Sequence, residues 1–316
     1  CIAISNGPLS TSEDKIPSGR VKFNITYAGF AKIVSEILAR FEISPLPLFI
    51  VGSDLFGSEI IKELHLNNIS VDEILVTDNA PTSMYFELFD SESNKTLMHL
   101  SNSDISQCIT PQYLKSRHHI LRNASFFALE DAVPIESASY LLASYQDTPR
   151  YFLALVYSHV LTYRDSFKYL NMITISQEML EKLTGISNHN NRVDEDEHIV
   201  TLARTFLQAG PKSVLIPYAG KKLCYATEGS CYILSNDTPD LPYVSYEACR
   251  TAVFAAFVYY EHDDTPLLDK LNYVAAAQML SSDSIDTNKY MHYNISPSNI
   301  NNALKNSSFG IKCINF

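Results

Sequence analysis

The stretch FIVGSDLFGSEIIKELHLNNISVDEILV, residues 49–76, contains an apolar run, a segment of helical spacing and a second apolar run. The first run ends in a glycine and is typical of a buried strand. The segment SEIIKELHLNN places its apolar residues three and four apart, as one face of a helix does. A strand followed by a helix and another strand is the unit from which a parallel sheet is built.

The same alternation continues along the chain in both directions. A helix is predicted at 31–41, and residues 83–90 and 95–101 predict a hairpin around the turn SESN. Further strands are predicted at 2–5, 20–26, 46–52, 71–78, 125–131, 151–157, 170–176 and 213–219. This rhythm predicts an α/β fold with a mostly parallel central sheet covered by helices on both faces, as a single domain over residues 1–316.

Composition and charge exclude several classes of function. The 24 basic and 35 acidic residues give a formal charge of −11, which argues against direct nucleic-acid binding through the general field of the chain, although a local basic patch stays open. No apolar run reaches the ~18 to 20 residues that cross a bilayer. The start CIAISNG carries no basic region before an apolar one. We therefore expect a soluble, cytoplasmic protein without a membrane partner.

Cysteine and glycine usage add to these exclusions. The six cysteines are scattered without a CxxC pair, so they predict reduced, buried thiols rather than a zinc site or disulfides. Only 10 residues are glycine, although phosphate loops need glycine where backbone approaches phosphate. The segment VGSDLFGS, residues 51–58, has the spacing of a phosphate loop but lacks its lysine. We expect no phosphate loop there.

The order of these segments resembles the phosphofructokinase B family of sugar and nucleoside kinases, and its pseudouridine-kinase-like branch in particular. VGSDLFG matches the family's VGxDxFG, which is the most specific motif of the comparison. The hairpin at 80–105, the segment LNMITISQEMLEKLTG and the helix LLDKLNYVAAAQML follow in the expected order. The resemblance implies a ribokinase-like three-layer sandwich with a small β lid, whose strands are expected within 8–26 and 82–102.

The catalytic motif of that family is not retained. Active members carry GAGD at a helix N-terminus, where backbone N–H groups hold the transferring phosphate and the aspartate is the base. The resemblance places there Glu247, Ala248, Cys249 and Arg250, or Ala248 to Thr251 if the register shifts by one. Neither frame contains a glycine or an aspartate. Arg250 cannot accept a proton, and Glu247 would place negative charge where the phosphate sits. A displaced glutamate acting as the base stays open.

The motifs for magnesium and nucleotide are also altered. The family's NxxE falls on Ser176 and Met179, and a thioether does not replace a carboxylate toward a hard cation. Glu178, one residue away, would point elsewhere. The T-x-G on the nucleotide side falls on Pro217, Tyr218 and Ala219. The resemblance therefore implies no metal site and no nucleotide cofactor.

The sugar-binding positions differ as well. The family's substrate aspartate falls near Leu9 or Ser10. Its double-glycine turn with a following asparagine is reduced to Ala28, Gly29 and Ile33. These positions form at most a vestigial cleft.

Losses at the base, the anion hole, the magnesium shell and the sugar pocket together predict a catalytically inactive pseudokinase. Its partner would be a protein or a macromolecular assembly of unknown identity, and dimerisation through the lid stays open. The alternative is an active ATP-dependent nucleoside or sugar kinase with a rearranged site.

Three polar features are interpreted as structural. Arg250 is expected to be a surface or ion-paired residue, because such positions are common for an arginine near a helix start. His118 and His119, beside Arg117, are expected to be a solvated pair ahead of a strand rather than an anion site. Residues 194–197 are expected to form an exposed acidic turn.

Overall fold

A computed structural model describes residues 2–6, 22–90, 95–102, 104–188, 193–218, 222–236, 246–282, 294–307 and 309–316. These residues divide into two compact units. The first takes in the residues up to Glu36 and Ser44–Cys108, and the second takes in Ile37–Ile43 and the residues from Ile109 onward. The expectation of a single domain over the whole chain stays a prediction.

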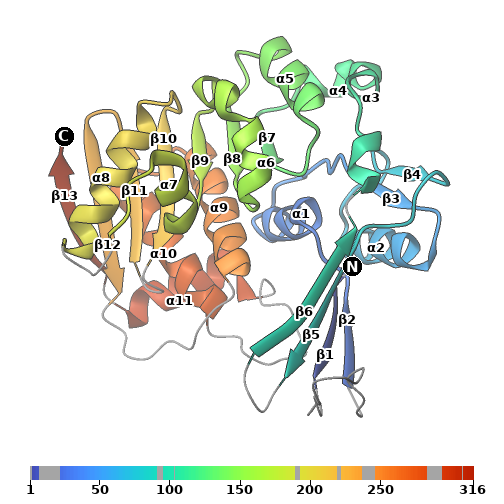
Figure 1. The fold of residues 1–316 in the computed structure, drawn as a ribbon, viewed down its shortest axis with the longest axis horizontal. Helices are drawn as coiled ribbons and strands as arrows, with labels where there is room; N and C mark the ends of the chain where they lie inside the picture. The colour runs from blue at the N-terminus through green and yellow to red at the C-terminus, as the bar shows by residue number, and fades with distance from the viewer. Residues whose placement is uncertain are drawn as a thin grey trace. The chain divides into compact units, whose positions relative to one another are not determined.

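The first unit contains a four-stranded sheet (Figure 1), formed by β1 (Ile2–Asn6), β2 (Lys22–Thr26), β5 (Met84–Asp90) and β6 (Lys95–Asn102). The strand order is β2-β1-β5-β6, with β1 parallel to β5 and the other two pairs antiparallel. The predicted hairpin is therefore present as β5 and β6, with an irregularity between Leu88 and Phe89. Assignment of this sheet as a lid stays a prediction.

The strand–helix–strand segment at 49–76 is confirmed in the same unit. Strands β3 (Ile50–Gly52) and β4 (Leu75–Thr77) pair in parallel, and α2 (Leu55–Leu66) connects them. Helix α1 (Phe30–Arg40) precedes them, and a 3₁₀ turn, η1 (Asp104–Cys108), follows the sheet.

The aspartate and the second glycine of VGSDLFG have structural roles in this chain's own contacts. Asp54 caps α2, with Oδ1 accepting hydrogen bonds from Gly57 N at 2.9 Å and Thr82 Oγ1 at 2.7 Å. Its Oδ2 accepts from Thr82 N at 2.7 Å. A Cβ on Gly57 would lie 2.2 Å from the carbonyl oxygen of Gly52. The side chain of Asp54 thus caps the start of α2 and ties it to Thr82.

The second unit contains a seven-stranded mixed sheet of order β13-β12-β11-β10-β9-β8-β7 (Figure 1). The strands are β7 (Phe127–Glu130), β8 (Arg150–Leu153), β9 (Met172–Thr174), β10 (Ser213–Tyr218), β11 (Lys222–Thr227), β12 (Ser230–Asn236) and β13 (Phe309–Asn315). Pairing is parallel from β7 to β10 and antiparallel from β10 to β13. The sequence patterns predicted β7 to β10 and missed the three antiparallel strands.

Helices alternate with the parallel strands of this sheet along the chain, as in an α/β fold. They are α3 (Pro111–Ser116), α4 (His118–Leu121), α5 (Ile135–Ser144), α6 (Tyr157–Thr162), α7 (Gln177–Thr184), α8 (Glu195–Leu207), α9 (Tyr246–His262), α10 (Leu267–Ser282) and α11 (Pro297–Asn306), with a 3₁₀ turn η2 (Arg164–Tyr169). Every residue of β8, β9 and β10 is buried. Complete burial is the signature of strands covered on both faces, so the α/β fold class is confirmed.

The expected thiols and membrane helices can be checked in the part of the chain that the structure describes. Cys224, Cys231 and Cys249 are free and buried, whereas Cys313 is free and exposed. Among the described residues, the helices include none with the length and apolar character of a bilayer span.

Candidate functional site

The first two turns of α9 hold Cys249, Arg250 and Thr251, and all three side chains are buried. Glu247 and Ala248 belong to the same helix, but their side chains lie outside the described residues. Arg250 was expected to be a surface or an ion-paired residue, and at 7% exposure the surface alternative is wrong.

The guanidinium of Arg250 joins α9 to the end of β8. Its Nη1 donates a hydrogen bond to the carbonyl oxygen of Ala154 at 2.7 Å. Ala154 follows directly after Leu153, the last residue of the strand. The predicted strand at 151–157 therefore ends earlier than its apolar pattern suggested, and the freed backbone groups of 154–156 are used in tertiary contacts.

Asp131 supplies the negative charge next to this arginine. It follows β7 directly, is 4% exposed, and its Oδ2 accepts hydrogen bonds from Leu155 N at 2.7 Å and Val156 N at 2.6 Å. Burial raises the pKa of the Asp131 carboxyl, and the two backbone N–H groups together with electrostatic interactions with His159 and Arg250 only partly oppose that shift.

The sequence patterns did not indicate Asp131 as a candidate site residue. The signal that could have found it is the Glu-Asp pair placed directly after the apolar run FFAL. The carboxyl ends of neighbouring parallel strands meet at one edge of a sheet, where functional groups gather.

Cys249 contributes no reactive thiolate to this turn. Burial raises the pKa of its thiol to about 11, against the opposing effects of hydrogen bonding with Ser281 and Gln278 and of the Arg250 charge. The thiol is therefore protonated at neutral pH and is a poor nucleophile. Around the start of α9, the described side chains provide a fixed cation and a neutral thiol.

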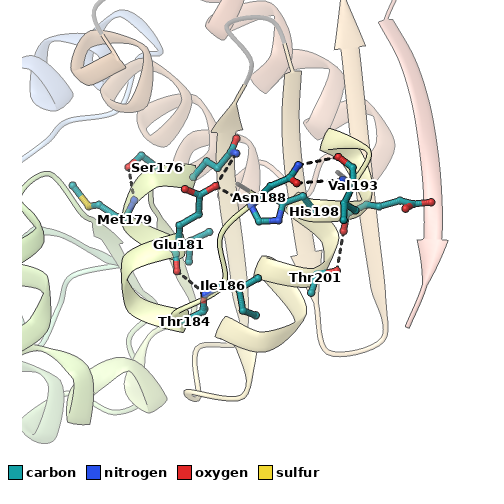
Figure 2. A network of polar contacts seen from close by, with 12 residues as sticks. Ser176, Met179, Glu181, Thr184, Ile186, Asn188, Val193, His198 and Thr201 are labelled. Atoms are coloured by element: carbon teal, nitrogen blue, oxygen red, sulfur yellow. Dashed lines mark hydrogen bonds and ion pairs between the residues drawn. The ribbon is translucent and has the colours of Figure 1, made fainter. Parts of the chain in front are cut away.

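The positions that the resemblance assigns to magnesium belong to the start of α7. Ser176 is the N-cap of this helix, and its Oγ accepts a hydrogen bond from Met179 N at 3.3 Å (Figure 2). Met179 is buried, and the exposed Glu178 pairs with Lys182 at 2.6 Å along the helix surface. These side chains do not fit a magnesium ion, which requires oxygen ligands converging on one point. The described residues contain no group of three His, Cys, Asp or Glu side chains that could hold a metal ion.

A second carboxylate of α7, that of Glu181, contacts the neighbouring helix α8. Glu181 Oε1 accepts from Gln177 Nε2 at 3.1 Å and lies 2.8 Å from His198 Nε2 on α8. Figure 2 shows Glu181 and His198 facing each other between the two helices. Between α7 and α8, Asn188 Nδ2 donates a hydrogen bond to Val193 O at 2.8 Å, and Asn188 Oδ1 accepts one from Val193 N at 3.2 Å.

The nucleotide-side positions lie at the end of β10. Pro217 and Tyr218 are buried in the strand, and Ala219 lies outside the described residues. Tyr218 donates its hydroxyl proton to Asp196 Oδ1 at 2.9 Å, and Lys222 Nζ lies 2.7 Å from the same oxygen. Burial raises the pKa of Asp196, but the hydrogen bonds from Lys222 and Tyr218 outweigh it, so the net shift is downward.

The acidic segment at 194–197 is therefore more than an exposed turn. Asp194 caps α8 by accepting from the N–H groups of Asp196 and Glu197. The side chain of Asp196 is only 20% exposed because it lies against Lys222. The simple interpretation as a solvated turn is wrong for Asp196.

The vestigial sugar positions lie in the first unit. Ala28 is buried, and Gly29 adopts φ 142°, a conformation that favours glycine. The carbonyl oxygen of Gly29 accepts from Ile33 N at 2.9 Å and so begins α1. Leu9 and Ser10 lie outside the described residues.

Comparison with known proteins agrees with this fold. The sequence pattern of the pfkB family carbohydrate kinases matches residues 7–236. Pseudouridine kinase from Escherichia coli (strain K12) is 22% identical over 208 residues, which are 66% of this chain and 64% of that protein. The chain thus matches less than two thirds of the length of this relative.

Solved structures with the same fold include two kinases. A carbohydrate kinase from Agrobacterium tumefaciens superimposes with a TM-score of 0.77 at 13% identity, covering 99% of this chain and 96% of that chain. Arabidopsis thaliana ribokinase complexed with ribose and ATP superimposes with a TM-score of 0.76 at 16% identity, covering 96% of this chain and 95% of that chain. At these identities the similarity establishes a ribokinase-like fold.

Proposed function

Because the chain belongs to the pfkB family of carbohydrate kinases, we propose that it keeps the fold of these enzymes without transferring phosphate, and that it acts as a binding or scaffold protein in a larger assembly. Phosphoryl transfer needs a base, an anion hole, a magnesium shell and a positioned acceptor. The residues of this chain support none of these roles at the positions where the family has them.

The observation that carries this proposal is the burial of Arg250. A guanidinium stays protonated at all physiological pH values, so it cannot accept the proton of an attacking hydroxyl. Its Nη1 is already bonded to Ala154 O at 2.7 Å, and the Asp131 carboxylate lies in its field. The N-terminal part of α9 is therefore tied to the end of β8 by a buried arginine, at the position where the family has its base.

The test measures nucleotide binding and phosphate transfer on the purified protein. We expect no saturable binding of magnesium-ATP by calorimetry at millimolar nucleotide, and no transfer to pseudouridine, ribose or adenosine. Circular dichroism and a cooperative thermal transition would confirm that the sample is folded. Transfer to any of these acceptors by wild type would contradict the proposal. Partners copurifying from the native source, identified by mass spectrometry, would test the binding role.

A second candidate function is an active kinase with a rearranged site, and Asp131 is the observation that favours it. Its carboxyl lies near the start of α9 and has a raised pKa, as general bases often do. If wild type is active through this group, Asp131→Asn will abolish transfer while leaving the fold intact. Glu178→Gln is the matched control, because the exposed Glu178 carboxylate pairs with Lys182 on the surface of α7.

A further inference from the structure

Residues 113–123, YLKSRHHILRN, form a concentrated basic segment in a chain whose net charge is −11. The segment covers α3 and α4, which lie next to each other and beside α5 in Figure 1. Four of its basic side chains are exposed, and the fifth, Arg117, is half-buried. We call this set the α3–α4 basic surface: Lys115, Arg117, His118, His119 and Arg122.

The charges of two members of this surface are not neutralised. In the part of the chain that the structure describes, neither Lys115 nor Arg122 forms an ion pair with a carboxylate. Lys182 and Lys222, by contrast, pair with carboxylates at 2.6 and 2.7 Å. The α3–α4 basic surface therefore keeps a local positive potential despite the acidic chain.

Aromatic rings of the second unit hold these side chains in place. The Arg117 guanidinium carbon lies 3.8 Å from the centroid of Tyr113, and Lys115 Nζ lies 5.4 Å from that of Tyr140. His118 Nδ1 lies 2.9 Å from the Tyr145 hydroxyl oxygen. Side chains that are ordered before binding lose less conformational entropy when a partner arrives.

From these contacts we infer that the α3–α4 basic surface docks an acidic segment of a partner protein. Guanidinium and ammonium groups bind carboxylates through charge-assisted hydrogen bonds. Nucleic acid fits less well, because the net charge of −11 repels a long polyanion. Tyr113 and Tyr145 are only 8% and 7% exposed, so their rings are not available to stack on bases. This inference names the kind of partner for the proposed binding role.

The experiment measures the binding of a short fluorescein-labelled peptide of alternating glutamate and glycine by fluorescence anisotropy. We expect saturable binding by wild type that weakens as ionic strength rises. The double variant Lys115→Glu with Arg122→Glu should bind about tenfold more weakly, because two attractive contacts become repulsive. A peptide of alternating glutamine and glycine should not bind.

The matched control is the double variant Arg164→Glu with Lys168→Glu, which makes the same charge change at two exposed residues of η2. It should bind the acidic peptide within about twofold of wild type, a difference of a few tenths of a kcal/mol. Absence of saturable wild-type binding, or equal weakening in both variants, would overturn the inference. So would tighter binding of a labelled single-stranded RNA through Lys115 and Arg122. None of these readouts depends on phosphate transfer, so the result is separate from the test of the kinase site.

Discussion

Arg250 Nη1 donates a hydrogen bond of 2.7 Å to the carbonyl oxygen of Ala154, and through it the N-terminal part of α9 is tied to the end of β8. Asp131, at the end of β7, binds the N–H groups of the next two residues, Leu155 and Val156. Residues 154–156 are thus held from both sides by opposite charges. The carbonyl oxygen of Ala154 gives the buried guanidinium a hydrogen-bond acceptor, which a buried charged donor requires.

Arg250→Met should lower the free energy of unfolding by ~1 to 3 kcal/mol, because it removes the buried hydrogen bond from the guanidinium to the carbonyl oxygen of Ala154. Urea denaturation followed by circular dichroism would measure the change. Arg164→Met, at an exposed arginine of η2, should change stability by less than ~0.5 kcal/mol. Equal effects of the two substitutions would mean that the cation at position 250 stabilises nothing.

Arg250→Asp should not restore phosphate transfer. A base alone contributes ~10²- to 10⁴-fold and requires a phosphate and an acceptor that are already positioned. The substitution would also place a second buried carboxyl beside Asp131, so we expect a lower unfolding temperature. A coupled assay with pseudouridine and magnesium-ATP would check activity, and measurable turnover by this variant would show that the other parts of the site are intact.

The contribution of Asp131 to stability should depend on pH. Its pKa in the folded protein lies above the ordinary value of 3.8. A carboxyl with a raised folded-state pKa favours folding fully below its unfolded pKa, and that contribution is lost as pH rises through the folded pKa. The stability of wild type relative to Asp131→Asn should therefore fall as pH rises above the ordinary carboxyl pKa of 3.8. Urea titrations across this range would measure the difference, and an increase with pH would mean that Arg250 outweighs burial.

Much of the fold could be predicted from the sequence because its signals are local. The apolar runs of β7 to β10 and the VGSDLFG turn each lie within a short window. β11 and β12 were missed because their short segments, KLCYAT and SCYILSN, mix polar and apolar residues. Whether these segments are buried depends on the strands with which they pair. A short stretch of sequence does not contain that information.

The candidate site was harder to predict because its contacts are long-range. Arg250 meets Ala154 across 96 positions of the chain, and Asp131 meets Leu155 across 24. Arginine usually lies on the surface of a protein and is buried only when its charge has a partner. Asp131 belongs to no recognisable sequence motif. Its role depends on the ends of β7 and β8 lying side by side, which only the structure shows.

Gly57→Ala should destabilise the first unit by ~3 kcal/mol or more, because its Cβ would lie 2.2 Å from the carbonyl oxygen of Gly52 and the contact is with backbone. Gly229→Ala is the control, since a Cβ there would meet no atom within 4 Å. Thermal unfolding of the two variants would compare them. If Gly57→Ala were as stable as Gly229→Ala, the glycines of this motif would be required for something other than close packing.

The pairing of β12 with β13 also affects how the chain folds. These strands are neighbours in the sheet, yet the chain between Asn236 and Phe309 includes α9, α10 and α11. β10, β11 and β12, in contrast, follow one another through short connections. Closing a long loop is slower than closing a short one, so this meander should gain amide-exchange protection before β13 docks. Arg250 lies within the long loop and would be among the last residues to reach its native contacts.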